Sequence, residues 1–181
     1  GGMQLFHLEG DDPYDKFLPK ISSVVLKIFI VYLILTIILF FLYYLNGMSL
    51  FDSIAHSFTT ISTGGFSTHN NSFAYFNNIT ILNIAIIFMI LGSFPFLVLA
   101  QSSFSNITSI IKDHQIRLFL IILILAISLI YFFAKNYVDG DIYYKISTIS
   151  FNTISIISGT GYVSDNFENW GNYASVLFLI L

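Results

Sequence analysis

Long stretches without a formal charge constrain the fold of this chain more than any other feature. Residues 28–45 are apolar or Tyr except for Thr36. At a rise of ~1.5 Å per residue, a helix of this length reaches about 27 Å, close to the ~30 Å hydrocarbon core of a bilayer. Residues 79–100 and 118–134 are also free of Asp, Glu, Lys and Arg. The sequence therefore predicts three transmembrane helices, and an apolar stretch that begins near Tyr173 predicts the start of a fourth.

The composition excludes several classes of protein. Hydrophobic residues make up 56% of the chain and charged residues 9%, whereas a soluble domain carries about 25% charged residues. The net charge of -3 gives no basic excess for nucleic acid, and the absence of Cys removes disulfides, thiolate nucleophiles and zinc–thiolate sites. The sequence contains neither paired carboxylates nor a nucleophile placed beside a base at membrane depth, so no motif indicates an enzyme. We therefore expect an all-α polytopic membrane protein that is not an enzyme, uses no cofactor and binds no nucleic acid.

The few charges predict the orientation in the membrane. Basic residues flank the starts of the first and third apolar stretches: Lys16, Lys20, Lys27, Lys112 and Arg117. Two spans separate these places, so both lie on one side, which the positive-inside rule assigns to the cytoplasm. The opposite side carries acidic Asp52, Asp139, Asp141, Asp165 and Glu168 and basic Lys135 and Lys145. We expect an acidic outer mouth, which concentrates cations by electrostatic focusing.

Two connections between the apolar stretches are too apolar for exposed loops. Residues 50–78 carry one formal charge, Asp52, and join two helices on the same side of the membrane. The sequence predicts a re-entrant segment there, with a short helix at about 51–61 followed by an extended Gly-containing strand. Residues 142–157 predict a second short helix, and 158–165 predict a second such strand. Non-helical backbone at membrane depth is tolerated only within protein or beside a watery cavity.

The two connections form an internal repeat. An offset of 96 residues superposes Ile61 on Ile157, Ser62 on Ser158, Gly65 on Gly161, Phe66 on Tyr162, Thr68 on Ser164 and Asn70 on Asn166. The repeated unit is helix, re-entrant pore loop, helix, and two spans per unit give both units the same orientation.

The repeat predicts the organisation of the chain. The expected parts are a cytoplasmic polar entry segment at 1–20, a complete pore unit at 21–100 with its pore helix and filter at 50–70, a cytoplasmic linker at 101–115, and a second pore unit at 116–181 with its filter at 158–165. The second unit stops within its last helix, and the chain opens with Gly rather than Met. We therefore expect a fragment of a longer protein.

Such loops favour coordination of a cation by backbone carbonyls. Extended Gly-rich backbone presents oxygens at similar distances without a fixed charge that would trap the ion. Gly65 and Gly161 allow a positive φ without a Cβ penalty. Thr60, Thr63 and Thr160 either add hydroxyl oxygens or brace the loops. A short helix that descends from the outer side also directs the negative end of its dipole toward the pore centre.

Two motifs resemble a known family. Residues 56–69, HSFTTISTGGFSTH, resemble the second filter of the Trk-type potassium uptake proteins (the TrkH/KtrB family), and residues 158–165, SGTGYVSD, resemble the third. The opening GGMQL at 1–5 is similar to the stretch that enters the second unit of that family. The resemblance covers essentially the whole chain. It implies K+ uptake through a pore of four units, two of which lie here, and a gating loop beyond the last residue.

The resemblance also implies a site and partners. Six loop residues would form the potassium-binding filter, four facing the ion and two as filter glycines. The four are Thr63, Gly64, Gly159 and Thr160, and the two are Gly65 and Gly161. K+ would be the transported ion rather than a cofactor, with no transition-metal site. Family members form homodimers in the bacterial inner membrane, as multi-pass proteins, and associate with a cytoplasmic nucleotide-binding regulatory subunit (TrkA-like).

Two other classes of membrane protein are alternative interpretations of the sequence. A secondary transporter with broken helices would use a discontinuity such as Gly92 and Pro95, but it predicts inverted rather than parallel repeats. A structural or sensory module would make the filter-like loops incidental, as packing contacts or tight turns. Replacing Gly65 would be silent in such a module and would abolish or broaden ion selection in a channel.

The remaining polar and aromatic residues favour structural roles. His56 and His69 lie on different predicted elements, with no carboxylate or Cys at zinc-ligand spacing, so we expect His56 to pack within the pore helix. His69 and Asp165 fall at equivalent positions at the outer end of each loop. The residues interpreted as headgroup anchors are Trp170 and the pairs Tyr43–Tyr44 and Tyr143–Tyr144.

Overall fold

A computed structural model of the chain describes residues 13–101 and 112–180, and every regular element in these ranges is helical. The α-helices are α2 (Pro13–Leu45), α3 (Leu50–Ile61), α4 (Ile79–Gly92), α5 (Phe96–Gln101), α7 (His114–Ala134), α8 (Ile142–Ile157) and α9 (Asn172–Ile180). Two 3-10 turns, η1 (Ser72–Tyr75) and η2 (Phe167–Asn169), follow the two loops. The predicted all-α class is confirmed. Most of the predicted entry segment and linker lies outside the described residues.

The two short helices lie where the sequence predicts them. α8 coincides with the predicted second short helix, and α3 begins one residue before the predicted first. Each starts with a side-chain cap. The Ser49 hydroxyl accepts a hydrogen bond from the Asp52 N–H, and the Asp141 carboxylate accepts one from the Tyr144 N–H. Such caps satisfy backbone N–H groups that have no partner within the helix.

α2 and α7 have the surface of membrane-spanning helices. The stretch Ser22–Leu45 of α2 has a mean hydropathy of 2.9, and α7 has 2.8. Only 11% and 22% of their most apolar windows are buried. Large side chains such as Phe41 on α2 and Ile124 and Leu125 on α7 are more than half exposed. Since a soluble protein rarely exposes apolar surface of this extent, both helices are suited to lipid rather than water.

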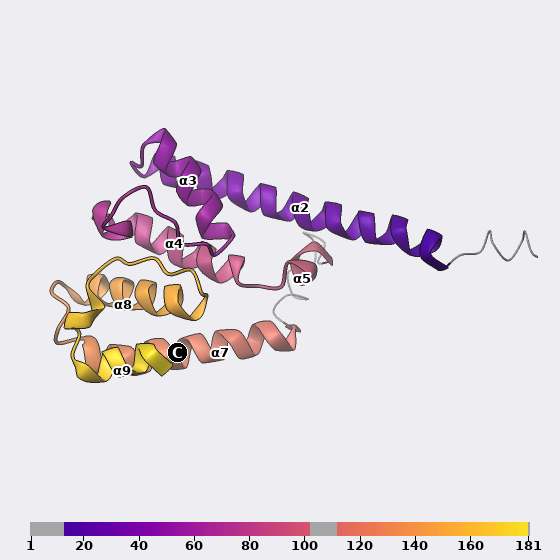
Figure 1. Cartoon of the computed structure of the whole chain (residues 1–181). Coiled ribbons are helices and arrows are strands. Elements are labelled where there is room, and N and C mark those ends of the chain that lie inside the picture. Colours follow the sequence, from indigo (N-terminus) through magenta and orange to yellow (C-terminus); the bar gives the residue numbers. More distant parts are fainter. Residues whose placement is uncertain (1–12, 102–111, 181) are drawn as a thin grey trace, which may run out of the picture.

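The second predicted span is wrong as a continuous helix. α4 ends at Gly92, and α5 begins only after Pro95. Proline has no N–H to donate and disfavours helical backbone at the residue before it. The Pro95 carbonyl instead accepts the Val98 N–H at 2.9 Å and starts the next helix. α5 then packs against α2 (Figure 1).

The helices pack around a core that both units share. α2 packs against α3 and α5, α4 packs against α3 and α8, and α7 packs against α8 and α9 (Figure 1). The main core includes Leu39 from α2, Met89 from α4 and Phe151 from α8, all fully buried. The contact between α4 and α8 brings the loops of the two units to one region of the molecule.

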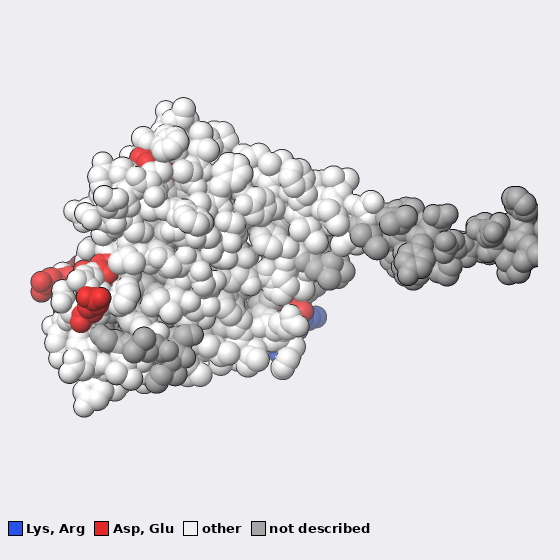
Figure 2. Space-filling view, in the orientation of Figure 1, with Lys and Arg blue, Asp and Glu red and all other residues white. Residues whose placement is uncertain are grey.

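Formal charges lie mainly at two opposite ends of the molecule. In Figure 2 the visible Asp and Glu side chains gather mainly at the end where α7 leads into α8, and the visible Lys and Arg side chains lie near the start of α7. At the acidic end, Asp139 and Asp165 line one cavity of about 250 Å³ together with Tyr144 and Trp170. This separation agrees with the predicted acidic and basic sides of the membrane.

The end of α4 leads to a first prediction. A Cβ at Gly92 would lie 2.7 Å from the Ile61 carbonyl oxygen at the end of α3, so Gly92→Ala would force the two helix ends apart. Overpacking of this kind costs about 1–3 kcal/mol. We expect a lower unfolding temperature for the purified full-length variant in detergent. Ser93→Ala is the control, because the Ser93 hydroxyl donates to the Met89 carbonyl of its own helix. Equal unfolding temperatures for the two variants would contradict the expected clash.

Candidate functional site

The two loops share the same backbone hydrogen bonds. The Gly65 N–H donates to the Thr59 carbonyl at 3.4 Å, and the Gly161 N–H donates to the Ser155 carbonyl at 3.0 Å, 96 positions further on. Three other bonds recur at this offset. In the first loop they run from Ser62 N–H to the Phe58 carbonyl, from Thr63 N–H to the Thr60 carbonyl and from the Thr59 hydroxyl to the Phe66 carbonyl. In the second they run from Ser158 N–H to the Ile154 carbonyl, from Gly159 N–H to the Ile156 carbonyl and from the Ser155 hydroxyl to the Tyr162 carbonyl. Each short helix therefore turns into its loop in the same way.

Alternate residues of both loops adopt the left-handed backbone conformation. In the first loop φ is 50° at Thr63 and 67° at Gly65, and in the second it is 73° at Gly159 and 82° at Gly161. Glycine adopts this region without a steric penalty, whereas a β-branched residue such as Thr63 is strained there. Such strain clusters at functional sites and persists only where the surrounding contacts hold it.

The loops touch at Gly65, where the side chain of any larger residue would clash with the opposite loop. A Cβ on Gly65 would lie only 1.7 Å from the Thr160 carbonyl oxygen. At Gly159 and Gly161, by contrast, an added Cβ would meet no atom of the described residues within 4 Å beyond its chain neighbours. The structure therefore brings the two predicted filter segments together, and their contact depends on close backbone approach at Gly65.

The six predicted potassium-binding residues differ in exposure. Three glycines are exposed, two residues are half-buried and one is buried: Gly64, Gly159 and Gly161, then Thr63 and Gly65, then Thr160. The Thr160 hydroxyl hydrogen-bonds to the Ser158 hydroxyl at 2.7 Å, and the Thr63 hydroxyl donates to the Ser62 carbonyl at 2.8 Å. Both hydroxyls are thus engaged within their own loops, and the exposed glycines present backbone groups alone.

Tyr162 of the second loop fastens that loop to the first unit. Its side chain is 1% exposed, and its hydroxyl hydrogen-bonds to the Thr59 and Thr60 hydroxyls at 2.5 and 3.2 Å. The centroid of its ring lies 4.4 Å from that of Phe73 in η1. Thr60 therefore braces the loops, which is one of the two roles that the sequence allowed. The repeat places Phe66 at the equivalent position, yet Phe66 is 77% exposed, so the sequence did not reveal this contact.

Two of the predicted headgroup anchors are wrong. Trp170 is 1% exposed, and its Nε1–H donates to the Asp165 carboxylate at 3.0 Å. Tyr43 is fully buried in the main core. Tyr143 is exposed, as an interfacial position requires. A ring with a polar tip suits both an interface and a buried polar contact, so the residue type alone does not distinguish them.

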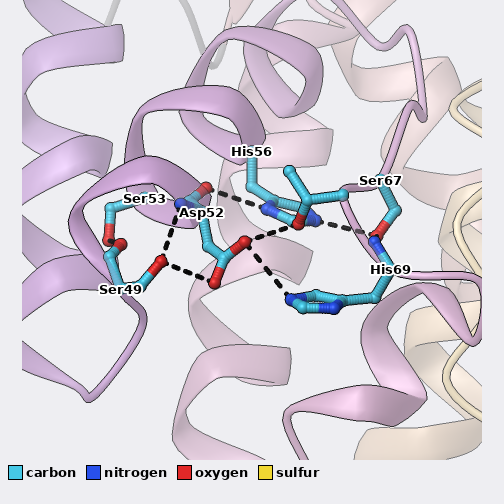
Figure 3. A network of polar contacts seen from close by, with 7 residues as sticks. Ser49, Asp52, Ser53, His56, Ser67 and His69 are labelled. Atoms are coloured by element: carbon cyan, nitrogen blue, oxygen red, sulfur yellow. Dashed lines mark hydrogen bonds and ion pairs between the residues drawn. The ribbon is translucent and has the colours of Figure 1, made fainter.

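A polar network holds the outer end of the first loop against α3. Asp52 is 8% exposed, and its carboxylate oxygens accept hydrogen bonds from the Ser49 and Thr68 hydroxyls at 2.7 and 2.5 Å. His69 Nε2 lies 3.2 Å from the Asp52 carboxylate (Figure 3). Burial raises the pKa of the Asp52 carboxyl, but the hydrogen bonds from the two hydroxyls and the neighbouring His69 outweigh burial and lower the pKa below its ordinary value. Asp52 is therefore held as a carboxylate.

His56 joins the same network to the loop backbone. It is fully buried, with one ring nitrogen 2.8 Å from the Asp52 carbonyl and the other 3.0 Å from the Ser67 hydroxyl (Figure 3). The packing role predicted for His56 is confirmed. Sequence reasoning missed the network, because 13 positions separate His56 from His69 and only the fold brings both to Asp52.

The structure is that of a polytopic membrane protein made of helical units. Each unit has a Gly-containing loop, and the two loops meet at a candidate ion site. The chain belongs to the TrkH family of cation transport proteins, whose family model matches residues 4–164. The resemblance seen in the two loop motifs is thereby confirmed.

Known proteins resemble the chain over almost its whole length. The Trk system potassium uptake protein TrkI of Halomonas elongata is 31% identical over 182 residues, which cover 100% of this chain and 37% of TrkI. TrkG of Escherichia coli (strain K12), another Trk system potassium uptake protein, is 32% identical over 184 residues, covering 100% of this chain and 38% of TrkG. The crystal structure of the potassium transporter TrkH from Vibrio parahaemolyticus matches with a TM-score of 0.81 at 29% identity, covering 90% of this chain and 36% of that protein. The chain thus spans little more than a third of the length of these relatives.

Proposed function

We propose that the full-length protein takes up K+ across a bacterial inner membrane. The names of its relatives support this function, since TrkI and TrkG are potassium uptake proteins and the solved TrkH is a potassium transporter. The observation that carries the proposal for this chain is the contact between its two loops, where Gly65 meets the Thr160 carbonyl. Two segments with matching left-handed residues then lie side by side, as a shared filter requires.

The proposed potassium site is the backbone of the six loop residues. They are Thr63, Gly64, Gly65, Gly159, Thr160 and Gly161. Carbonyl dipoles replace the water around K+ without trapping the ion. Neither group of three residues carries a formal charge, and α3 and α8 end just before the loops, with the negative ends of their dipoles there. This combination favours a weakly held monovalent cation.

We extend the proposal to the remaining architecture of the family. The two loops would form two sides of a filter that four units close. Phe66 is 77% exposed although the equivalent Tyr162 is buried against the neighbouring unit, which supports a further unit packed on Phe66. A homodimer and a TrkA-like nucleotide-binding regulatory subunit are proposed as partners on the resemblance alone.

A secondary transporter is the second candidate. The break between α4 and α5 at Pro95 favours it, since such transporters bind their substrates at discontinuous helices. The hydrogen bonds that recur at a constant offset in both loops favour the filter instead, because they describe a parallel repeat.

Uptake of radioactive Rb+ tests the proposed function. K+-starved cells that lack their own K+ uptake systems would express the full-length protein, and cells with an empty vector would serve as the control. We expect uptake that external K+ suppresses and Na+ does not, because a carbonyl filter selects between these ions. The substitution Gly65→Ser should lower this K+-sensitive uptake of Rb+. Absent uptake from a well-expressed, membrane-inserted protein, or uptake indifferent to Gly65→Ser, would contradict the filter.

A further inference from the structure

Three consecutive residues at the outer limb of the first loop lie against polar side chains of α3. Ser67 bonds to His56, and Thr68 and His69 both approach the Asp52 carboxylate (Figure 3). We call these five residues the outer clamp. The clamp begins two positions after Gly65, so the place of the loop backbone beyond that glycine depends on it.

The second loop has a counterpart of the clamp, but the helix positions equivalent to Asp52 and His56 carry side chains that do not titrate. Asn152 stands 96 positions after His56. Its Nδ2–H donates to the Ser164 hydroxyl at 2.8 Å, and its Oδ1 accepts the Ser164 N–H at 3.2 Å. The two hydrogen bonds between the Asn152 side-chain amide and Ser164 thus hold the second loop to its short helix, as the histidine and carboxylate hold the first.

Two further clamp positions, those of Asp52 and His69, also differ between the loops. Thr148 stands in the place of Asp52, and its buried hydroxyl has no hydrogen-bond partner in the described part of the chain. Asp165 stands in the place of His69 and accepts a bond from Trp170 instead. Of the two loops, the first is therefore the one held to its short helix through a formal charge.

We propose, on the basis of the function proposed above, that Asp52 and His69 are positioning residues for cation selection and that they make the hold on the first loop depend on external pH. They act on the ion through the outer limb of the loop. A carbonyl filter discriminates between ions by the placement and strength of its dipoles. A charge-assisted contact holds such a limb more firmly than a neutral one.

The direction of the pH effect follows from the groups around His69. Among the described residues, the titratable groups that face it are Asp52 and His56 from α3 and Tyr75 from η1, whose ring stacks on it at 3.5 Å. Its side chain is 25% exposed, so protons reach it. The contact between His69 Nε2 and the Asp52 carboxylate at 3.2 Å is an ion pair only when the imidazole carries a proton. Because lower pH favours the protonated form, the clamp should be tighter and selection stronger at lower pH.

The test compares how strongly Na+ and K+ inhibit Rb+ uptake by the full-length protein. The selectivity ratio is measured at an external pH of about 5.5 and about 7.5, within the range in which histidine side chains act as pH switches. We expect the wild-type ratio to be roughly two- to fivefold higher at the lower pH, the range of a partly exposed ion pair. His69→Gln should remove this difference. Asp52→Asn should also lower the ratio about tenfold at both pH values, since it weakens the bond from Thr68 as well, and Asp52→Glu should restore part of it.

Asp165→Asn is the matched control. It changes the residue at the position equivalent to His69 and removes a charge from the same side of the protein, but it lies outside the clamp. The pH dependence should survive this change. Unchanged selectivity and pH dependence in both Asp52→Asn and His69→Gln would overturn the proposal.

Hydrogen exchange of residues 62–71 in the purified full-length protein supplies a readout without transport. We expect faster exchange there in Asp52→Asn, with unchanged exchange in α7, and equal exchange would overturn the proposal. If Asp52→Asn does not reach the membrane, His69→Gln decides by its pH profile. If the wild-type protein takes up no Rb+, the proposed function and the selection role both fail, and faster exchange would then show a clamp that serves another purpose.

Discussion

Gly65→Ala is expected to lower Rb+ uptake by the full-length protein at least tenfold and to reduce the preference for K+ over Na+. The added Cβ would lie 1.7 Å from the Thr160 carbonyl oxygen, so the two loops must move apart. Overpacking and a side chain at positive φ each cost about 1–3 kcal/mol, and about 1.4 kcal/mol is a tenfold effect. Uptake is measured per amount of protein in the membrane.

Two other glycines separate the causes of this effect. Gly47 has φ +105 in the turn between α2 and α3, and an added Cβ would meet no described atom within 4 Å. Gly47→Ala therefore adds backbone strain outside both loops and should leave uptake close to wild type. Gly159→Ala adds strain within the second loop but no clash and should have an intermediate effect. Normal uptake and selectivity in Gly65→Ala would refute the close contact between the loops.

Tyr162→Ala is expected to destabilise the protein more than any other single truncation in the loops. The side chain is 1% exposed and packs between η1 and the end of α3. Loss of a buried aromatic ring costs about 3–5 kcal/mol through the cavity that it leaves. Because the ring joins the two units, the loops should also lose their alignment. Thermal unfolding of the purified full-length protein in detergent measures the loss.

A second variant distinguishes the contribution of the Tyr162 hydroxyl to stability from that of its ring. Tyr162→Phe keeps the ring and leaves the Thr59 and Thr60 hydroxyls without this partner, which costs about 1–3 kcal/mol. Tyr44→Ala is the matched control, since it removes the same side chain from a half-exposed position at the end of α2. A Tyr162→Ala variant as stable as Tyr44→Ala would show that the ring does not join the units.

The helices could be predicted because their signals are local. Runs without charge, a cap such as Asp141 before α8 and the period of the repeat can all be read along the chain. A break at Pro95 is expected from the sequence only for the alternative class of secondary transporter, whereas the main prediction is one continuous span. A charge-free run of 22 residues indicates a span, and it outweighed the local effect of one proline, which bilayer helices tolerate when neighbouring groups compensate.

The candidate site could be predicted only in part. The motifs located both loops, and a positive φ was expected at Gly65 and Gly161, where the structure shows it. It also occurs at Thr63 and Gly159, for which the sequence carried no such expectation. Threonine is disfavoured in this conformation, and glycine is compatible with every conformation, so neither residue type reveals it.

The sequence by itself determined that this protein is a helical membrane protein with two similar units, because apolar length and repeat period are properties of the chain alone. Only the tertiary structure decided which residues meet. It joins Gly65 to Thr160, Tyr162 to Thr60 and His69 to Asp52. The partners in these pairs are 95, 102 and 17 positions apart. A buried polar or aromatic group needs a partner of the right shape and chemistry, but many residues meet that requirement, and helix packing selects one of them.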